Sequence, residues 1–294
     1  MANSRALDKR RKSVKNIRKI TRTMELIATA RFKKAMDRAT AATAYTKRIT
    51  DLVGSLSKTG LEVSHPLLDE RPEIKKCNLL VLSGNRGLCG GYNGNVIRAG
   101  LSRWEEINNT IPSSSIEISG KRGISAFKHR GIEADKSYTN FDDKPTFEEV
   151  DALATGYLDA YAAGEIDRLD VVYTKFLTIS KQVATVETLL PLGSLDLEPG
   201  EEEEAGGEQM YEFEPSAESI LEEVVPTSFK IKLFKCFLDA AVSEQVARMV
   251  AMKGATENAG DLIKQLSMAY NRARQSQITG EIMEIIGGVE ALNN

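Results

Sequence analysis

A glycine-rich segment, Ser83 to Gly94, is the part of the chain whose residue types come nearest to a chemical site. Backbone amides in such a turn, together with the N-terminus of a following helix, attract phosphate and other anions. The spacing does not match a nucleotide-binding motif: the glycines do not form G-x-G-x-x-G, and Gly120-Lys121 is followed by Arg122 where a phosphate loop needs Ser or Thr. Two interpretations stay open, a phosphate site and a tight turn whose helix entry is capped by Asn93.

Other residues with catalytic or metal-binding chemistry are few. His65 and His129 are the only histidines, and neither belongs to a zinc-binding motif. The three cysteines, Cys77, Cys89 and Cys236, are odd in number and far apart, which favours free thiols in a reducing compartment and makes the cytoplasm the default location. Cys89 is either an activated thiol near a helix start or a buried small residue. We expect no catalytic residue, no cofactor and no metal.

Charge is distributed unevenly along the chain. Residues 1–50 hold seven Lys and eight Arg against three acids, a local charge of +12, whereas residues 196–223 hold twelve acids and no base. These blocks cancel in a formal net charge of −3, which argues against a globally basic nucleic-acid binder, although the basic segment alone could meet an acidic partner. No run of about 18 apolar residues occurs, so we expect no membrane span. The Arg and Ser content of the N-terminus mildly resembles an organelle transit peptide, without the apolar stretch of a secretory signal.

The elements that would position these residues begin with two proline-free arms. All eight prolines lie between Pro66 and Pro226, so neither end contains the residue that breaks helices. Alternating steps of three and four residues give an apolar stripe in each arm, typical of a coiled-coil seam. The N-terminal stripe is Val14, Ile17, Thr21, Met24, Ala28, Arg31, Ala35, Arg38, Ala42, Tyr45, Ile49, Leu52 and Leu56. The C-terminal stripe is Leu238, Val242, Gln245, Met249, Met252, Thr256, Ala259, Ile263, Leu266, Tyr270 and Ala273.

The arms are predicted to pair as long antiparallel helices, because an intervening domain returns the chain to the same end. Roughly 55 residues before the first glycine region would make an N-terminal rod of about 80 Å. After Ala273 the stripe shifts phase and continues through Ile278 to Leu292, so the last two dozen residues are expected to leave the partner helix and contact something else. The alternative is that both stripes belong to core helices of a bundle.

The middle of the chain alternates between strand and helix patterns. Cys77 to Ser83 is a nearly continuous apolar run, as in a strand buried on both faces, and later strands and helices follow it in turn. We expect an α/β fold: a small Rossmann-like, mostly parallel domain between the two coiled-coil helices. The predicted segments are 1–60 for the N-terminal helix, 74–195 for the α/β domain, 196–226 for an acidic loop and a short helix that Pro226 ends, and 227–294 for the C-terminal helix.

The ordered motifs resemble those of the γ subunit of F-type ATP synthase, the central rotor shaft. Ser13 to Met24, Ser83 to Asn93, and Ser243 to Lys253 followed by Ile278 to Gly288 match the family's blocks, and Tyr270 to Gln275 is a further match. The resemblance covers essentially the whole chain. The sequence departs from the family pattern at Arg22-Thr23, Gly280 and Val289. By this resemblance the glycine-rich segment is a structural signature and not a nucleotide site.

The resemblance implies a non-catalytic subunit that transmits rotation between a membrane c-ring and a catalytic hexamer, coupling proton flow to ATP synthesis or hydrolysis. Its partners would be three α and three β subunits of F1, the ε subunit and the c-ring of Fo, with no nucleic acid, on the cytoplasmic face of the bacterial inner membrane as a peripheral protein. Contacts to the catalytic subunits carry over to Met24, Arg248, Gln275, Thr279 and Glu281. Foot contacts to the c-ring and ε carry over to Tyr211 and Phe213.

Two other classes stay open from the residues alone. A basic coiled-coil nucleic-acid binder would bind DNA with steep salt dependence. An α/β nucleotide-binding enzyme would retain ATP as an isolated chain. Neither class explains the three ordered blocks.

Overall fold

The computed structural model describes residues 4–58, 66–68, 71–141, 144–192 and 217–293; at 41–58, 217–221 and 290–293 the helix backbone alone is described. These residues divide into two compact units. One unit combines the start of the chain, through Thr29, with the end, from Arg248; the other spans Ala30–Ala247. Each unit is described by itself. The division of the chain at 60, 74, 195 and 226 stays a prediction.

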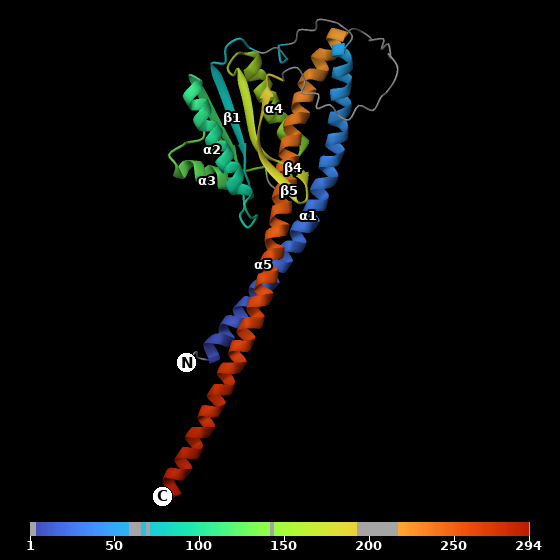
Figure 1. The fold of residues 1–294 in the computed structure, drawn as a ribbon. Helices are drawn as coiled ribbons and strands as arrows, with labels where there is room; N and C mark the ends of the chain where they lie inside the picture. The colour runs from blue at the N-terminus through green and yellow to red at the C-terminus, as the bar shows by residue number, and fades with distance from the viewer. Residues whose placement is uncertain (1–3, 59–65, 69–70, 142–143, 193–216, 294) are drawn as a thin grey trace. The chain divides into compact units, whose positions relative to one another are not determined.

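The larger unit contains a five-stranded sheet in the order β3-β2-β1-β4-β5 (Figure 1). The strands are β1 (Lys76–Leu82), β2 (Ser113–Ser119), β3 (Lys136–Tyr138), β4 (Arg168–Thr178) and β5 (Lys181–Leu190). The pairs β1–β2, β1–β4 and β2–β3 are parallel, while β4 and β5 form an antiparallel pair. The prediction of a mostly parallel α/β sheet is therefore confirmed. The short strand β3 is an element that the sequence pattern did not indicate.

Helices cover both faces of this sheet. On one face, β1 and β2 side chains such as Leu79, Val81 and Ile116 pack with residues of α2 (Tyr92–Thr110) and α3 (Lys121–His129). On the other face, Leu80 and Leu82 pack with α4 (Phe147–Ala162) and with residues from the start of α5 (Ala217–Asn293). Parallel strands need apolar residues on both faces for this reason. The apolar run predicted for β1 is accordingly buried from Cys77 to Leu82.

The N-terminus of α4 follows from a local motif. The hydroxyl of Thr146 accepts a hydrogen bond from the Glu149 backbone NH at 3.4 Å, and the Glu149 carboxylate accepts one from the Thr146 NH at 3.1 Å. This reciprocal capping box satisfies two backbone donors that have no partner within the helix. It sets where α4 begins and therefore which of its side chains face the sheet.

Helix α5 runs from Ala217 to Asn293 with Pro226 inside it. The prediction that a short helix ends at Pro226 is therefore wrong. A proline within a helix costs about 3 kcal/mol, because it removes a hydrogen bond and clashes with the preceding turn. Here Val225 and Phe229, on either side of the proline, are at most 1% exposed in the core of the unit. Burial of two large side chains is worth about 1.5–3 kcal/mol each, enough to offset the proline.

The smaller unit consists of the ends of two long helices, α1 (Ser4–Lys58) and α5. The two helices are antiparallel, because contacts at higher residue numbers of α1 involve lower residue numbers of α5. Arg11 lies over the Tyr270 ring at 4.7 Å, and the hydroxyls of Thr21 and Thr256 are hydrogen bonded at 2.9 Å. Val14 packs with Ala259 and Leu266. The predicted antiparallel pairing is confirmed within this unit.

The buried seam of α1 is narrower than predicted. Val14, Thr21, Ala28 and Ala35, spaced by seven residues, are all below 10% exposed. Ile17, by contrast, is 52% exposed, and Arg38 is also exposed. Between these positions Met24 and Arg31 are half-buried, and Ala39, which the predicted stripe did not include, is 8% exposed. The seam positions predicted beyond residue 40 lie outside the side chains that the structure describes.

Candidate functional site

The glycine-rich segment after β1 forms a tight turn against the start of α3. The backbone NH of Ser83 donates to the Ser119 carbonyl at 2.8 Å, and the Ser83 hydroxyl accepts from the Gly123 NH at 2.9 Å. Gly120 has φ of +97°, and a Cβ there would lie 2.0 Å from the Ser83 carbonyl oxygen. A glycine is required at this position, because any side chain would collide with backbone. The turn and the helix therefore interlock directly.

Three backbone amides around the turn are occupied by the chain itself. The NH groups of Lys121 and Arg122 donate to the Asn85 side chain and the Gly84 carbonyl, at 3.0 and 3.2 Å. The Gly84 NH donates to Asn93 Oδ1 at 2.8 Å. An anion would have to displace these bonds before it could use the N-terminus of α3. At α2, the helix that follows the turn, the Tyr92 NH donates to the Cys89 carbonyl at 3.2 Å. The geometry favours the interpretation of a structural turn.

Asn93 does not cap the helix as predicted. Residue 91, a glycine, occupies the N-cap position of α2, without a side-chain cap. Asn93 instead cross-links the turn: besides accepting from Gly84, its amide donates to the Arg86 carbonyl at 3.0 Å and to Cys89 Sγ at 3.1 Å. Since the Asn93 side chain points back into the turn, it is not available for capping. Cys89 is 2% exposed, which favours its interpretation as a buried small residue over that as an activated thiol.

The other two cysteines are also buried, at 2% and 3% exposure. Burial raises the pKa of the Cys77 thiol to about 12, with the Asp170 carboxylate adding to the effect. Burial likewise raises the pKa of Cys236 well above its ordinary value. Both thiols therefore stay protonated near neutral pH and lack the thiolate that nucleophilic chemistry needs.

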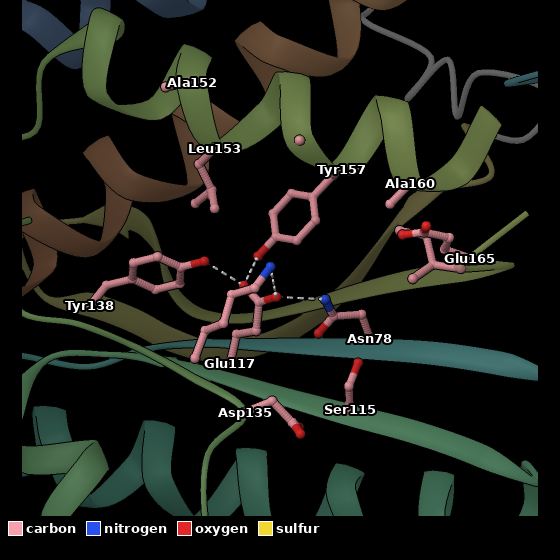
Figure 2. Close-up of a pocket in the computed structure, with 13 residues that line it drawn as sticks. Asn78, Ser115, Glu117, Asp135, Tyr138, Ala152, Leu153, Tyr157, Ala160 and Glu165 are labelled. Carbon is pink, nitrogen blue, oxygen red and sulfur yellow. Dashed lines mark hydrogen bonds and ion pairs between the residues drawn. The ribbon is translucent and has the colours of Figure 1, made fainter. Parts of the chain in front are cut away.

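A buried carboxylate, Glu117, lies in the middle of β2 and was not singled out from the sequence. It is 3% exposed and accepts hydrogen bonds from Tyr138 at 2.7 Å, Tyr157 at 2.6 Å and Asn78 at 3.0 Å (Figure 2). Lys136, its register partner on β3, lies 3.3 Å from the same carboxylate. The signal available in the sequence was an acid between two isoleucines, Ile116 and Ile118, because an acid among apolar strand residues is rarely buried unless it is paired.

The two phenols in this cluster are held in their neutral, donating form. Burial, then the hydrogen bond to Glu117, raises the pKa of Tyr138 above its ordinary value. Burial, then the negative charge of Glu117, raises the pKa of Tyr157 well above that value. Both effects disfavour a second negative charge beside the carboxylate. The cluster thus presents one fixed anion surrounded by donors.

The residues expected to contact catalytic subunits differ in exposure. Gln275, Thr279 and Glu281, near the end of α5, are exposed in the smaller unit, and Glu281 accepts from Gln277 at 2.9 Å. Met24 is half-buried, and Arg248 is 7% exposed. The structure thus brings three of the five to one exposed helical end. Tyr211 and Phe213, the expected foot contacts, lie outside the described residues.

The end of α5 runs beyond the start of its partner helix. Ser4, the first residue of α1, hydrogen bonds to Gln277 at 2.7 Å, and α5 continues to Asn293. The apolar side chains past this point are between 43% and 66% exposed: Ile278, Ile282, Met283, Ile285, Ile286 and Val289. The phase shift predicted after Ala273 therefore coincides with the place where α5 leaves the described part of α1. An exposed apolar surface of this extent marks an interaction site.

The features together define a class: a subunit whose α/β domain is joined to an antiparallel helical pair with an exposed apolar end, suited to docking in a larger assembly. A family model described as ATP synthase matches residues 3–292. The ATP synthase gamma chain of Rhodopirellula baltica is 65% identical over 294 residues, 99% of each chain, and that of Leptospira biflexa serovar Patoc is 40% identical over 293 residues. The chain belongs to the ATP synthase γ-chain family.

Solved structures share the fold. A chain in the Euglena gracilis mitochondrial ATP synthase (OSCP/F1/c-ring, rotational state 3) matches with a TM-score of 0.65 at 18% identity, covering 98% of this chain and 94% of that one. A chain in the Tetrahymena thermophila mitochondrial ATP synthase central stalk and c-ring matches with a TM-score of 0.55 at 18% identity, covering 80% and 99%. Among the described helices, none has a stretch long and apolar enough to cross a membrane.

Proposed function

We propose that this chain is the central rotor shaft of a proton-translocating F-type ATP synthase. It turns inside a hexamer of three α and three β subunits, while its α/β domain rests as a foot on the c-ring of Fo together with ε. The complex lies on the cytoplasmic face of the bacterial inner membrane, with which this chain associates only peripherally. The chain carries torque and forms no bond with the nucleotide, so it is non-catalytic by itself.

The observation that carries this proposal is the exposed apolar end of α5. Residues 278–293 extend past the start of α1 by about 24 Å, taking about 1.5 Å for each residue. Exposure of large apolar side chains to water along a helix of that length is unfavourable, and burying them against surrounding protein stabilises the helix. The wall of an axial cavity in a ring of subunits would surround the helix and bury these side chains.

A single helical shaft inside a threefold ring necessarily presents a different face to each catalytic subunit. Identical subunits then differ in their contacts and therefore in nucleotide affinity. Because the effect is a coupling free energy, it is reciprocal: nucleotide occupancy biases the shaft angle as much as the shaft angle biases occupancy. We assign part of the differential contact to Gln275, Thr279 and Glu281, which are exposed on α5, and Met24 and Arg248 complete the proposed set.

The basic N-terminal segment supports the same assignment by its charge. Residues 1–50 carry a local +12, and an axial partner surface with acidic segments would complement it. Such complementarity contributes to orientation and to the rate of assembly more than to affinity. The proposal gives Tyr211 and Phe213 contacts with the c-ring and ε.

Rotation of this chain in a hexamer tests the proposal directly. The chain would be co-expressed with the α and β subunits of its own synthase, and a bead attached to a cysteine introduced at the exposed Lys128 of α3. The three native cysteines are buried, so the chain without Lys128→Cys is a matched control that should take no bead. We expect co-purification and unidirectional, ATP-driven rotation of the bead. A chain that does not join the hexamer, or that joins it and stays fixed during hydrolysis, would contradict the rotor assignment.

A further inference from the structure

The strands β4 and β5 extend past β1 as a two-stranded ribbon. The pairing of β1 with β4 ends at Val172, whereas β4 continues to Thr178 and stays paired with β5 as far as Lys181. We call residues 173–178 and 181–185 the ribbon. A two-stranded hairpin is at best marginally stable by itself in water, so the ribbon needs packing from other elements.

The turn at the end of the ribbon is fixed by side chains. The Thr178 hydroxyl accepts a hydrogen bond from the Lys181 NH at 3.1 Å. The side-chain amide of Gln182 donates to the carbonyls of Thr178 and Ile179, at 2.7 and 2.8 Å. Because these bonds join the last residues of one strand to the first residues of the next, they restrain the turn. The ribbon is therefore a stiff element.

The ribbon packs on both long helices within the larger unit (Figure 1). The ring centroids of Phe176 and of Phe32 on α1 are 6.3 Å apart, with an angle of 50° between the rings. The fully buried hydroxyl of Ser243 on α5 donates to the Thr174 carbonyl at 3.1 Å. Phe176 also packs against the buried cluster that the two helices form here, Ala35, Ala39, Leu238, Val242 and Val246.

Helix α5 is anchored in the α/β domain by large side chains. Phe229, Leu233 and Phe237 are at most 4% exposed, and they share a core cluster with strand residues such as Leu80 and Tyr173. Close-packed interiors have low compressibility and transmit strain. A force on the sheet therefore reaches α5 directly through this core.

Helix α1 is held by smaller side chains. The two buried residues between positions 30 and 40 are alanines, Ala35 and Ala39, and residues 59–75 separate α1 from β1 along the chain. A methyl group makes few van der Waals contacts, so these alanines resist sliding of α1 only weakly. The larger contact between this stretch of α1 and the sheet is the ring pair of Phe32 with Phe176.

We propose that the ribbon is a clamp that fixes α1 to the α/β domain. Phe176 is its contact with α1, and the hydrogen bond between Ser243 and Thr174 is its contact with α5. Torque that acts on the domain then enters both helices of the shaft instead of α5 alone. This use of the clamp rests on the proposed rotor function, whereas the clamp itself is a property of the isolated chain.

Hydrogen exchange of the isolated full-length chain, followed by mass spectrometry, tests the clamp. Phe176→Ala removes one ring of the pair, and backbone amides in residues 30–40 of α1 should exchange about threefold faster or more, because local opening depends on packing. Amides in residues 229–237 of α5 keep their core contacts, so their exchange should stay within about twofold of the parent rate. Phe176→Tyr keeps the ring and should restore the parent rate in α1.

Trp104→Ala is the matched control. Trp104 is also a half-buried aromatic residue that packs on the sheet, but it lies on α2, in a cluster without α1 or α5 residues. This variant should leave exchange in residues 30–40 unchanged. The double variant Phe32→Ala/Phe176→Ala should exchange no faster than either single variant, because both substitutions remove the same contact. Unchanged α1 exchange in Phe176→Ala, an equal increase in Trp104→Ala, or additive effects of the two phenylalanines would overturn the clamp.

A second measurement, in the assembled hexamer, tests the path of the torque. With nucleotide turnover stopped, the angular fluctuation of a bead attached through Lys128→Cys reports the stiffness between the domain and the shaft. Phe176→Ala should raise the angular variance by up to about twofold, because variance falls as stiffness rises and one loaded helix replaces two. Trp104→Ala should keep the parent variance. Equal variance in all three chains would exclude α1 from the path of the torque. The exchange measurement needs no partner subunit and no ATP, so its result is independent of whether the chain rotates.

Discussion

Asp239 of α5 gives the stability of this chain a specific dependence on pH. The side chain is 7% exposed, and burial raises its pKa from an ordinary value of 3.8 to about 6. Lys235 and Lys175 lower the pKa and Glu187 raises it, so burial prevails over the neighbouring cations. The folded state therefore holds this proton more tightly than the unfolded state does.

The sign and size of the effect follow from linkage. Between pH 4 and 6 the folded chain binds more protons at Asp239 than the unfolded chain, so the free energy of unfolding falls as pH rises through this window. A shift of about two pKa units at about 1.4 kcal/mol each corresponds to about 3 kcal/mol, lost in full above pH 6. Asp239→Asn keeps the shape and removes the charge. It should stabilise the chain by up to about 3 kcal/mol at pH 8 and have almost no effect below pH 4.

Urea unfolding of both chains between pH 4 and pH 8, followed by circular dichroism, measures this difference. Asp261→Asn is the control, since Asp261 is an exposed acid on the same helix, 3.2 Å from Lys264. We expect its effect to stay within about 0.5 kcal/mol at every pH, as for surface substitutions in general. A difference between Asp239→Asn and the parent chain that is independent of pH, or a variant less stable at pH 8, would show that burial of Asp239 is not what controls its ionisation.

Two further predictions concern a buried acid and the shaft surface. Asp170 is fully buried and accepts hydrogen bonds from Arg103 at 2.9 Å and from Arg168 at 2.8 Å. Asp170→Asn should leave these two cations poorly compensated and lower the free energy of unfolding, measured in urea at pH 7, by about 3 kcal/mol. A loss below about 1 kcal/mol would contradict this. Gln275→Ala should lower the rate of coupled ATP synthesis in reconstituted vesicles severalfold without preventing assembly. Gln265 is an exposed residue on the same helix, and Gln265→Ala should leave that rate unchanged. Equal rates in the two variants would remove Gln275 from the contact set.

Much of the backbone could be predicted from local patterns. The seven-residue repeat of Val14, Thr21 and Ala28 indicates a helix and its buried side, because side chains at that spacing lie on one face. The apolar run at Cys77 to Leu82 indicates a central strand for a similar reason. The interpretation of Pro226 as a helix end failed because helix propensity is local, while the packing of Val225 and Phe229 that outweighs it involves residues distant in sequence.

Of the two candidate sites, one could be predicted from the sequence and the other could not. The exposed end of α5 follows from the phase of its apolar stripe, which sequence shows directly. The cluster around Glu117 does not, since its donors come from β1, β3 and α4, and Asn78 and Tyr157 are 79 positions apart. These residues lie close together because of the order of the strands in the sheet and because of where the capping box starts α4. Neither of these can be read from the spacing of the residues along the chain.

The sequence by itself determined the family, the two long helices and the mostly parallel α/β domain, because each depends on the order and period of residues along the chain. Only the tertiary structure decided which seam positions are buried, that Asn93 ties a turn instead of capping a helix, and that Glu117 is buried among donors from three elements. These depend on the free energy of contacts between distant segments. Burial and hydrogen bonding across the fold have no local pattern from which they could be predicted.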